Sequence, residues 1–589
     1  MLKKLPIPPG LFSNDADYTA GPKWIRADKV RFWKGFVQKI GGWTNYTSNT
    51  FTGVCRAILG WRTIAQENTL SLGTHKKLYI YQSGAYTDIT PVRASGTLGT
   101  DPFTTTSGST SVSVAHTSHG TAVDDAVIFS GAAAVGGITV SGEYTVTSVT
   151  NSNAYVITHG STATSSASGG GASVAYQYLL AVGQQHTSYQ LGWGASTFGT
   201  GTWGTARSVS GLVALLRTWS LGNWGEDLIA CPWGKSVYLW DASVGIGTRA
   251  AIITNAPDSN FILVTTNRTV AAFGCTPSGS STIDPLFIRW SDVEDYTQWT
   301  PATSNSSGTH RIGGQATEIV GALETKNEIL VYTDIGLHSM RFTESENVYD
   351  FEHLGDECGL IGPNAAIDIN SVVYWMGKNS FYRYDGTIKR LDCSVQDEVF
   401  DEINKFQGRK VFAGINSQFT EIIWFWQDND TENDKYVIFN FEEGTWITGS
   451  LARTVWAAEN DAIGNNPIAA DFAGQLYNHE DGTDNVASAI TAYAETGEFE
   501  LDDGEHLSYI DKLVFDGDLT GSVDFTIKTR RYPQGAETTK GPYTVTTSTE
   551  KTNFRARGRQ WAIRWESDAT GDHWRLGNIR INIKKGGKR

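Results

Sequence analysis

A repeat in the middle of the sequence constrains the fold most. From residue 208 to 482, a strand, a turn, an aromatic strand and an Asp/Gly turn return about every 40–50 residues. Successive copies contain YLWD (238–241), FIRWSD (287–292), VYTDIG (331–336), YRYDG (382–386), FNFEEG (439–444) and LYNHEDG (476–482). This period is typical of β-propeller blades, which are four-stranded sheets that bury their faces against neighbouring blades.

The blade count follows from the same pattern. Residues 54–91 contain one more unit of this type, and because the terminal blade is uncertain, the sequence predicts a six-bladed β-propeller, with seven blades possible. The last blade can be completed by strands from both chain ends. Helical periodicity is confined to residues 395–406, and the predicted fold class is therefore all-β.

A segment of different composition interrupts the repeat. Residues 96–175 are dominated by Gly, Ser, Thr, Ala and Val, which is also the composition of flexible linkers. Four stretches in it alternate polar and apolar residues, as strands do and linkers do not: SVSVAH, AVIFSG, EYTVTSV and AYVITHG. We therefore favour a small inserted β-barrel or β-sandwich over a linker.

The repeat stops near residue 487, where a new series of alternating strands begins. Its length and strand count suit a β-sandwich of about 100 residues. The predicted domains are an N-terminal arm (1–53), a first propeller unit (54–95), the inserted β-domain (96–180), the remaining blades (181–486) and a C-terminal β-sandwich with a basic tail (487–589).

Charge and cysteine content limit the function. The 589 residues include 62 Asp and Glu against 47 Lys and Arg, a net charge of -15, which argues against a protein that grips nucleic acid through its phosphates. The five cysteines are scattered and favour reduced, buried thiols. Prolines interrupt the N-terminal segment, and no stretch is long and apolar enough for a membrane span, so neither signal peptide nor span is expected.

Catalytic and ligand-binding motifs give little support. A GxGxxG pattern (Gly199, Gly201, Gly204) is not followed by a helix, as a dinucleotide site requires. The two histidines of HTSH (116–119) would point to opposite faces of a strand. The sequence therefore predicts no catalytic, cofactor-binding or metal-binding residue and no cofactor, and we expect the chain not to be an enzyme.

Glycan hydrolysis stays open as an alternative because propellers host glycosidases. The segment SDVEDYTQW (291–299) comes nearest to the Ser-x-Asp-x-Gly-x-x-Trp turn of sialidase-type propellers, but it lacks the Asp and Gly spacing and occurs once. Two carboxylates at catalytic separation can arise anywhere among 62 acidic residues.

Two further sets of residues are functional candidates. In the loop GWGASTFGTGTWG (192–204), Trp193, Phe198 and Trp203 alternate with glycines, and we predict a channel gate or a ring interface there. The C-terminal module carries clustered cations that could meet an acidic partner or DNA, or simply form a solvated strand face and tail. The predicted docking residues are Arg555, Arg557, Arg559, Lys584, Lys585, Lys588 and Arg589.

Several segments in a fixed order resemble one protein family. They are residues 5–43 (LPIPPGLFSND…GGW), the loop 192–204, FIRWSDVEDYTQWTP (287–301), DECGLIGPNA (356–365) and RARGRQ…KKGGKR (555–589). Together they resemble the tail nozzle or hub proteins (tail tubular protein B-like) of short-tailed bacteriophages, the podoviruses. The inserted Ser/Thr-rich segment departs from the simplest members of that family.

The resemblance implies a structural virion protein. Such a protein forms a homohexameric ring below the head-to-tail adaptor ring, near tail fibres, spikes or a needle, and double-stranded DNA passes through it without specific binding. It is assembled in the bacterial host cytoplasm and resides in the virion tail. Six copies at -15 would carry about -90, and an acidic lumen would repel phosphates. A glycan-binding or glycan-hydrolysing tail component, or a cellular propeller scaffold, remains the competing interpretation.

Overall fold

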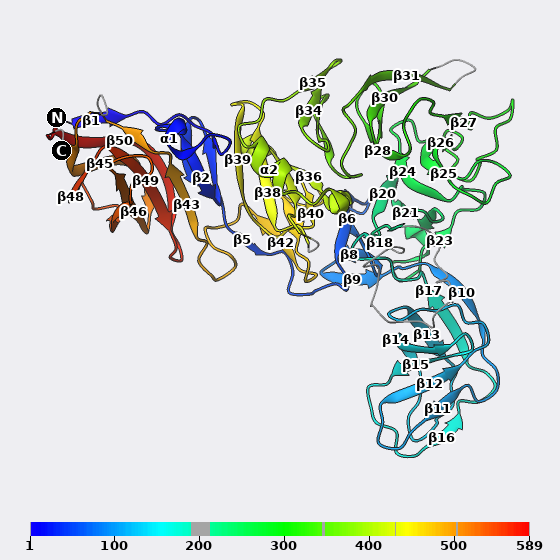
Figure 1. Ribbon diagram of the computed structural model, residues 1–589. Coiled ribbons are helices and arrows are strands. Elements are labelled where there is room, and N and C mark those ends of the chain that lie inside the picture. Colours follow the sequence, from blue (N-terminus) through cyan, green and yellow to red (C-terminus); the bar gives the residue numbers. More distant parts are fainter. Residues whose placement is uncertain (1, 190–212, 344–347, 430–431, 502–504, 588–589) are drawn as a thin grey trace, which may run out of the picture. The chain divides into compact units, whose positions relative to one another are not determined.

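The computed structural model describes residues 2–189, 213–343, 348–429, 432–501 and 505–587 (Figure 1). Strands make up 52% of the chain and helices 4%. The chain forms two compact units, one of Met1–Thr50 with Gly313–Arg589 and the other of Phe51–Ile312.

The unit of residues 51–312 contains three four-stranded antiparallel sheets whose strands follow one another in sequence order. The first consists of β6 (Cys55–Arg62), β7 (Asn68–Thr74), β8 (Leu78–Gln82) and β9 (Ala85–Asp88). The second consists of β20 (Trp219–Trp224), β21 (Asp227–Pro232), β22 (Tyr238–Trp240) and β23 (Ala251–Ile252). The third consists of β24 (Ser259–Val264), β25 (Val270–Cys275), β26 (Asp284–Trp290) and β27 (Gly308–Arg311).

The first two of these sheets are joined by a tryptophan ring that packs against a glycine. Trp219 on β20 is 2% exposed and lies on Gly73 of β7, where a Cβ atom would come within 2.5 Å of the indole. The Trp219 Nε1–H also donates to the Thr74 carbonyl at 2.7 Å. A residue with a side chain at position 73 would push the sheets apart, so the repeat needs both the large and the small residue.

The inserted segment folds as a separate β-domain with its own buried core. Its eight-stranded sheet has the order β10-β17-β13-β14-β15-β12-β11-β16, in which long β14 (Gly142–Asn151) pairs with β13 near its start and β15 further along. The other strands are β10 (Val92–Thr97), β11 (Phe103–Thr105), β12 (Ser111–Ala115), β13 (Ala126–Ser130), β15 (Ala154–Thr158), β16 (Ala167–Gly169) and β17 (Ala175–Leu179). The short pair β18 (Ser188–Tyr189) and β19 (Val213–Ala214) follows it, and the 3-10 helix η1 (Ala242–Val244) lies after β22.

The other unit contains four more four-stranded sheets. Three are continuous in sequence, and the first of these consists of β28 (Ile319–Glu324), β29 (Ile329–Thr333), β30 (Gly336–Phe342) and β31 (Tyr349–Asp356). The second consists of β32 (Ala366–Ile369), β33 (Val372–Met376), β34 (Phe381–Tyr384) and β35 (Ile388–Arg390). The third consists of β36 (Phe412–Asn416), β37 (Glu421–Trp426), β38 (Lys435–Asn440) and β39 (Thr445–Ser450). The fourth joins β40 (Val455–Ala457), β41 (Ile468–Ala470) and β42 (Leu476–His479) to β5 (Trp43–Asn45), from the other end of the chain.

The same packing rule recurs between blades in this unit. Trp456 on β40 lies on Gly414 of β36, where a Cβ atom would come within 2.3 Å of the ring. Its Nε1–H donates to the Ile415 carbonyl at 2.8 Å. Hydrogen bonding of a buried indole to a neighbouring blade's backbone satisfies a donor that burial would otherwise leave without a partner.

Two six-stranded sheets form the C-terminal β-sandwich, and both include strands from the N-terminal segment. One sheet, here called sheet A, contains β1 (Leu2–Leu5), β3 (Val30–Trp33), β4 (Phe36–Lys39), β45 (Ser508–Thr520), β48 (Thr552–Gly558) and β50 (His573–Lys585). The other, sheet B, contains β2 (Trp24–Asp28), β43 (Ala492–Thr496), β44 (Phe499–Glu500), β46 (Ser522–Arg530), β47 (Thr538–Thr546) and β49 (Gln560–Ser567). Pairing of β1 with β50 brings the two chain ends side by side (Figure 1).

A buried ion cluster fixes the N-terminal segment to the blades. Arg31 on β3 is 2% exposed, and its Nε donates to Glu421 on β37 at 3.0 Å while its Nη1 donates to Glu480 at 2.8 Å. Burial alone would lower the pKa of Arg31, but the carboxylates of Glu421 and Glu480 outweigh the effect of burial and raise that pKa. One cation facing two carboxylates leaves an excess negative charge, and burial raises the pKa of Glu421 to about 7 despite the opposing effect of Arg31.

The fold is all-β, with seven propeller-type blades among the described residues, an inserted β-domain and a C-terminal β-sandwich. The seventh blade exists because β5 completes β40–β42. The helical pattern at 395–406 forms α2 (Gln396–Glu402) and part of the 3-10 helix η2 (Lys405–Lys410); α1 (Asp17–Ala20) and η3 (Ser417–Phe419) are single turns. All five cysteines are free thiols, and four of them are buried.

Candidate functional site

The predicted docking cations separate into different places. Arg555 and Arg557 alternate with buried Phe554 and Ala556 on β48, the edge strand of sheet A, so both arginines lie on the outer face of that sheet. Lys584 on β50 shares this face, because it is paired in register with Tyr509, which is paired with Arg557.

The remaining predicted cations do not lie on that face. Arg559 sits at the corner between β48 and β49, with its guanidinium 4.8 Å from the centre of the Tyr532 ring. Lys585 follows Lys584 in the strand and is exposed at the end of the sheet, on the side opposite to Lys584. Lys588 and Arg589 lie outside the described residues.

Cations that the sequence did not single out complete the outer face. Lys4 on β1 pairs in register with Arg580 on β50, and Arg580 pairs with Val514 on β45; Lys4 and Arg580 are exposed. Lys512 on β45 pairs in register with Asn582, which is the next residue after Arg580 on the same face of β50. We call the set the basic face: Lys4, Lys512, Arg555, Arg557, Arg580 and Lys584. A neighbouring acid, Asp511, accepts hydrogen bonds from Lys584 Nζ and Asn582 Nδ2, each at 2.7 Å.

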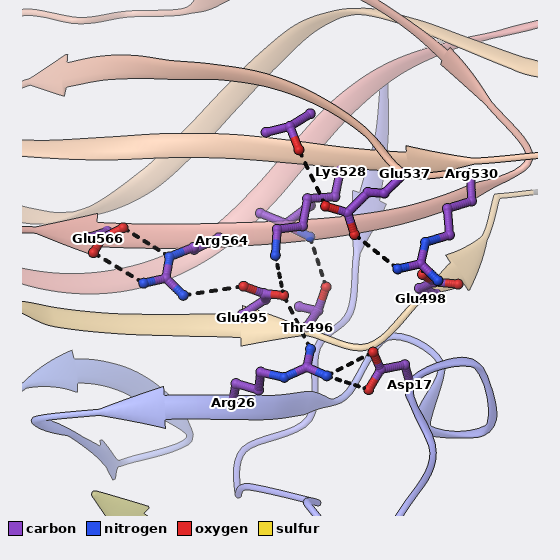
Figure 2. Close-up of polar contacts among 12 residues, drawn as sticks. Asp17, Arg26, Glu495, Thr496, Glu498, Lys528, Arg530, Glu537, Arg564 and Glu566 are labelled. Carbon is purple, nitrogen blue, oxygen red and sulfur yellow. Dashed lines mark hydrogen bonds and ion pairs between the residues drawn. The ribbon is translucent and has the colours of Figure 1, made fainter. Parts of the chain in front are cut away.

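Other basic residues of the C-terminal β-sandwich form ion pairs within the protein. Glu495 on β43 has a side chain 3% exposed and accepts from Lys528 Nζ at 2.8 Å, Arg26 Nη1 at 3.3 Å and Arg564 Nη1 at 3.3 Å (Figure 2). Three cations on one buried carboxylate form a network that links β2 to strands β43, β46 and β49 of the same sheet. Lys528 therefore has a structural role.

The network continues around its rim. Arg26 Nη2 donates to both oxygens of Asp17 at 2.8 Å, and Arg530 lies between Glu498 and Glu537, with N···O distances of 2.9 and 3.2 Å (Figure 2). Burial raises the pKa of Glu498, although Arg530 opposes this. Such alternating charges hold the N-terminal segment on the sandwich and leave no spare cation in this cavity of about 220 Å³.

Next to this network lies a groove of about 490 Å³ that we call the acidic groove. Its apolar lining comes from Leu11, Ile25, Ala27 and Tyr493. Its carboxylates are Asp15, Asp17, Asp397, Glu398, Asp401 and Glu402.

Several of these carboxylates already have partners. Asp17 is paired with Arg26, Asp15 with Lys23, and Glu402 with Lys435. Asp397 and Asp401 are exposed one turn apart on α2, so they present like charges to solvent on one face of the helix.

A larger cavity, of about 990 Å³, lies between the blade of β28–β31 and the blade of β32–β35. It is lined by Asp334, Asp356, Glu357 and Tyr382, among others. Burial acts to raise the pKa of Asp334, but hydrogen bonds from the Thr317 N–H at 2.9 Å and hydroxyl at 2.8 Å outweigh it, so the pKa is lowered. This carboxylate is held ionised at the cavity wall.

Two histidines also line this blade cavity. The rings of His338 and His353 are 4.9 Å apart, and His353 Nε2 lies 3.1 Å from Asp356 Oδ1. Imidazoles, carboxylates and one phenol together can donate to and accept from a hydroxyl-rich ligand.

The remaining sequence candidates are placed as follows. The gate loop with Trp193, Phe198 and Trp203 lies outside the described residues, as does the GxGxxG pattern. In the insert, His116 Nδ1 is 2.6 Å from the Tyr178 hydroxyl, and His119 Nε2 is 2.8 Å from the Asn151 carbonyl oxygen. The two histidines thus have separate partners within the protein.

Metal-binding clusters and membrane-spanning helices are absent from the described part of the chain. There, no group of three or more His, Cys, Asp or Glu side chains is placed to hold a metal ion. Within the same residues, no helix is long and apolar enough to cross a bilayer.

Comparison with known proteins gives matches among solved structures alone. No family model and no curated protein matches the chain. Phage phi92 endosialidase is 12% identical, with 68% of this chain and 53% of that chain covered and a TM-score of 0.18. The chain thus matches about half the length of that endosialidase.

Two glycoside hydrolases match a larger share of their own length. An exo-β-1,3-galactanase from Phanerochaete chrysosporium is 11% identical, with 59% of this chain and 98% of that chain covered and a TM-score of 0.21. A family 43 arabinoxylan arabinofuranohydrolase from Bacillus subtilis is 11% identical, with 62% and 79% covered and a TM-score of 0.19.

These matches contradict the expectation that the chain is not an enzyme, because the neighbours are an endosialidase and glycoside hydrolases. That expectation rested on the lack of linear catalytic motifs. Glycosidase carboxylates come together only in the folded chain, so their pattern is invisible in a sequence. At these identities and TM-scores, the matches specify neither a substrate nor a catalytic residue.

Proposed function

We propose that this chain is a tail component of a short-tailed bacteriophage and forms the nozzle or hub ring, a homohexamer that continues the DNA channel below the head-to-tail adaptor. The ordered resemblance of segments across the chain motivates the proposal. The observation that carries it is the path of the N-terminal segment, which supplies strands to sheet A, to sheet B and to the last blade within 45 residues.

The path of the N-terminal segment suits a protein that must withstand mechanical force. A conduit for a packaged genome must resist distortion, and a segment that pairs with both sandwich sheets and the last blade prevents the sandwich and that blade from moving independently. The buried cluster of Arg31, Glu421 and Glu480 adds a link between β3 and the blades of β37 and β42. The net charge of -15 fits a surface over which DNA slides without sticking.

Negative-stain imaging of the purified chain tests the ring. We expect particles with sixfold symmetry and a central hole, and the same antigen at the tail of intact virions by immunogold labelling. Particles that stay monomeric at micromolar concentration and an antigen absent from virions would refute the proposal.

A second candidate function is glycan binding or cleavage, favoured by the cavity of about 990 Å³ between two blades. Its three carboxylates, two imidazoles and Tyr382 match the polar groups that recognise sugar hydroxyls. This candidate predicts reducing-end release from, or saturable binding to, host-surface polysaccharide.

Matched variants test the cavity. Asp356→Asn with Glu357→Gln should abolish cleavage or weaken binding at least tenfold, whereas Asp518→Asn, at an exposed position on β45, should change neither. Equal loss in both variants, or no activity of the unmodified chain on any host polysaccharide, would count against this function.

A further inference from the structure

The basic face stands out against the charge of the whole chain. It presents six cations over four neighbouring strands, β1, β50, β45 and β48, in a protein whose net charge is -15. The inward side of the same strands is buried and apolar, with Ile510, Leu513, Ile579 and Ile581 each at most 3% exposed. The outer side is therefore a solvent-facing sheet face with a defined charge.

The acidic groove lies elsewhere in the same compact unit. Its lining comes from β2 and β43 of sheet B, from the segment before β2, from α2 and from β39, and includes no residue of sheet A. It combines an apolar lining with exposed carboxylates on α2, as protein interfaces combine an apolar centre with a polar rim.

We propose that the basic face of one copy docks onto the acidic groove of a second copy. This inference rests on the proposed ring and names the surfaces that would join its subunits. Two different, complementary patches on one molecule make a head-to-tail contact, and such contacts generate closed rings when the rotation between neighbours closes. Each subunit would then use both patches, one on either neighbour.

A second copy fits the basic face better than DNA does. The complementary surface is present on the same molecule at the same concentration, and burial of the face at every joint keeps its cations away from the DNA path. The acidic remainder then faces the polyanion, which agrees with passage without adhesion.

Charge reversal on each side tests the contact. One variant combines Lys4→Glu, Arg555→Glu and Arg580→Glu on the basic face, and the other combines Asp397→Lys and Asp401→Lys on α2. All five side chains are exposed, so both variants should fold, which circular dichroism and thermal melting check. Assembly is followed by mass photometry and analytical ultracentrifugation at fixed salt.

Each variant alone should fail to assemble, with its dissociation constant raised at least about 30-fold, because like charges then face one another. An equimolar mixture of the two should assemble again, since in alternating order every joint pairs either a reversed face with a reversed groove or an unreversed face with an unreversed groove. The matched control, Asp461→Lys with Asp568→Lys, changes exposed acids outside both patches and should assemble as the unmodified chain does.

The outcomes separate the two proposals. If the unmodified chain forms no ring, the proposed function itself fails. If the ring forms and either reversal leaves it unchanged, or the mixture does not recover, the docking inference alone is overturned. A fluorescent 30-bp DNA duplex provides a further arm: binding that the basic-face variant loses, with assembly unaffected, would make the face a DNA surface instead.

Discussion

The buried carboxylate Glu421 gives the most quantitative prediction. Its pKa is raised from 4.5 to about 7, so the folded chain holds a proton there that the unfolded chain releases near pH 4.5. The contribution of this proton to the free energy of unfolding is complete below pH 4.5 and is lost as the pH rises through 7. With about 1.36 kcal/mol per pKa unit, the loss between pH 5 and pH 8 is about 2–3 kcal/mol.

Replacement by glutamine removes this titration while keeping the shape of the side chain. The difference in unfolding free energy between Glu421→Gln and the unmodified chain should therefore shift in favour of the variant by about 2–3 kcal/mol from pH 5 to pH 8. Urea unfolding followed by tryptophan fluorescence measures it, because Trp424 and Trp426 are buried on the same strand, β37. Exposed Glu442→Gln is the control, and a difference that stays constant with pH would refute the reasoning.

Three further predictions concern stability, each measured by thermal or urea unfolding. Glu495→Gln should cost about 3–5 kcal/mol because three cations lose their shared carboxylate, whereas Glu566→Gln, 35% exposed, should cost under about 1 kcal/mol; equal effects would contradict the network. Gly414→Ala should cost about 1–3 kcal/mol through overlap with the Trp456 ring, and Gly99→Ala, with open space around it, should be nearly neutral. Dithiothreitol should leave the melting temperature unchanged because the five thiols are free, and a drop would reveal a disulfide.

The blades were predictable because their signal is local. An aromatic strand followed by an acidic or glycine turn needs no distant partner to be recognised, and six copies of it lie in the sheets of β20 to β42. The choice between six and seven blades was not predictable, since the deciding strand, β5, lies more than 400 residues before its partner β42. Strand register at that separation leaves no trace in a single sequence.

The candidate sites show the same limit. Arg555 and Arg557 alternate with buried Phe554 and Ala556, and because strand periodicity is local, a sequence can indicate that the two arginines share an exposed face. Lys4 and Arg580 join them through pairing between the two chain ends, which a linear sequence does not reveal. Conversely, Lys528 is bound to Glu495, because β43 and β49 place that carboxylate and Arg564 beside it, and a linear sequence does not reveal this pairing.

Pairing of β3 and β4 with β50 in one sheet also sets an order of events during translation. At about 5–20 residues per second, the ribosome needs roughly half a minute to two minutes to make the more than 500 residues between β4 and β50. Throughout that time Val30, Phe32 and Val37, each at most 3% exposed in the finished protein, have no C-terminal strand to cover them. The N-terminal strands are thus the part of the nascent chain most in need of a chaperone, and the last strand made is the one that releases it.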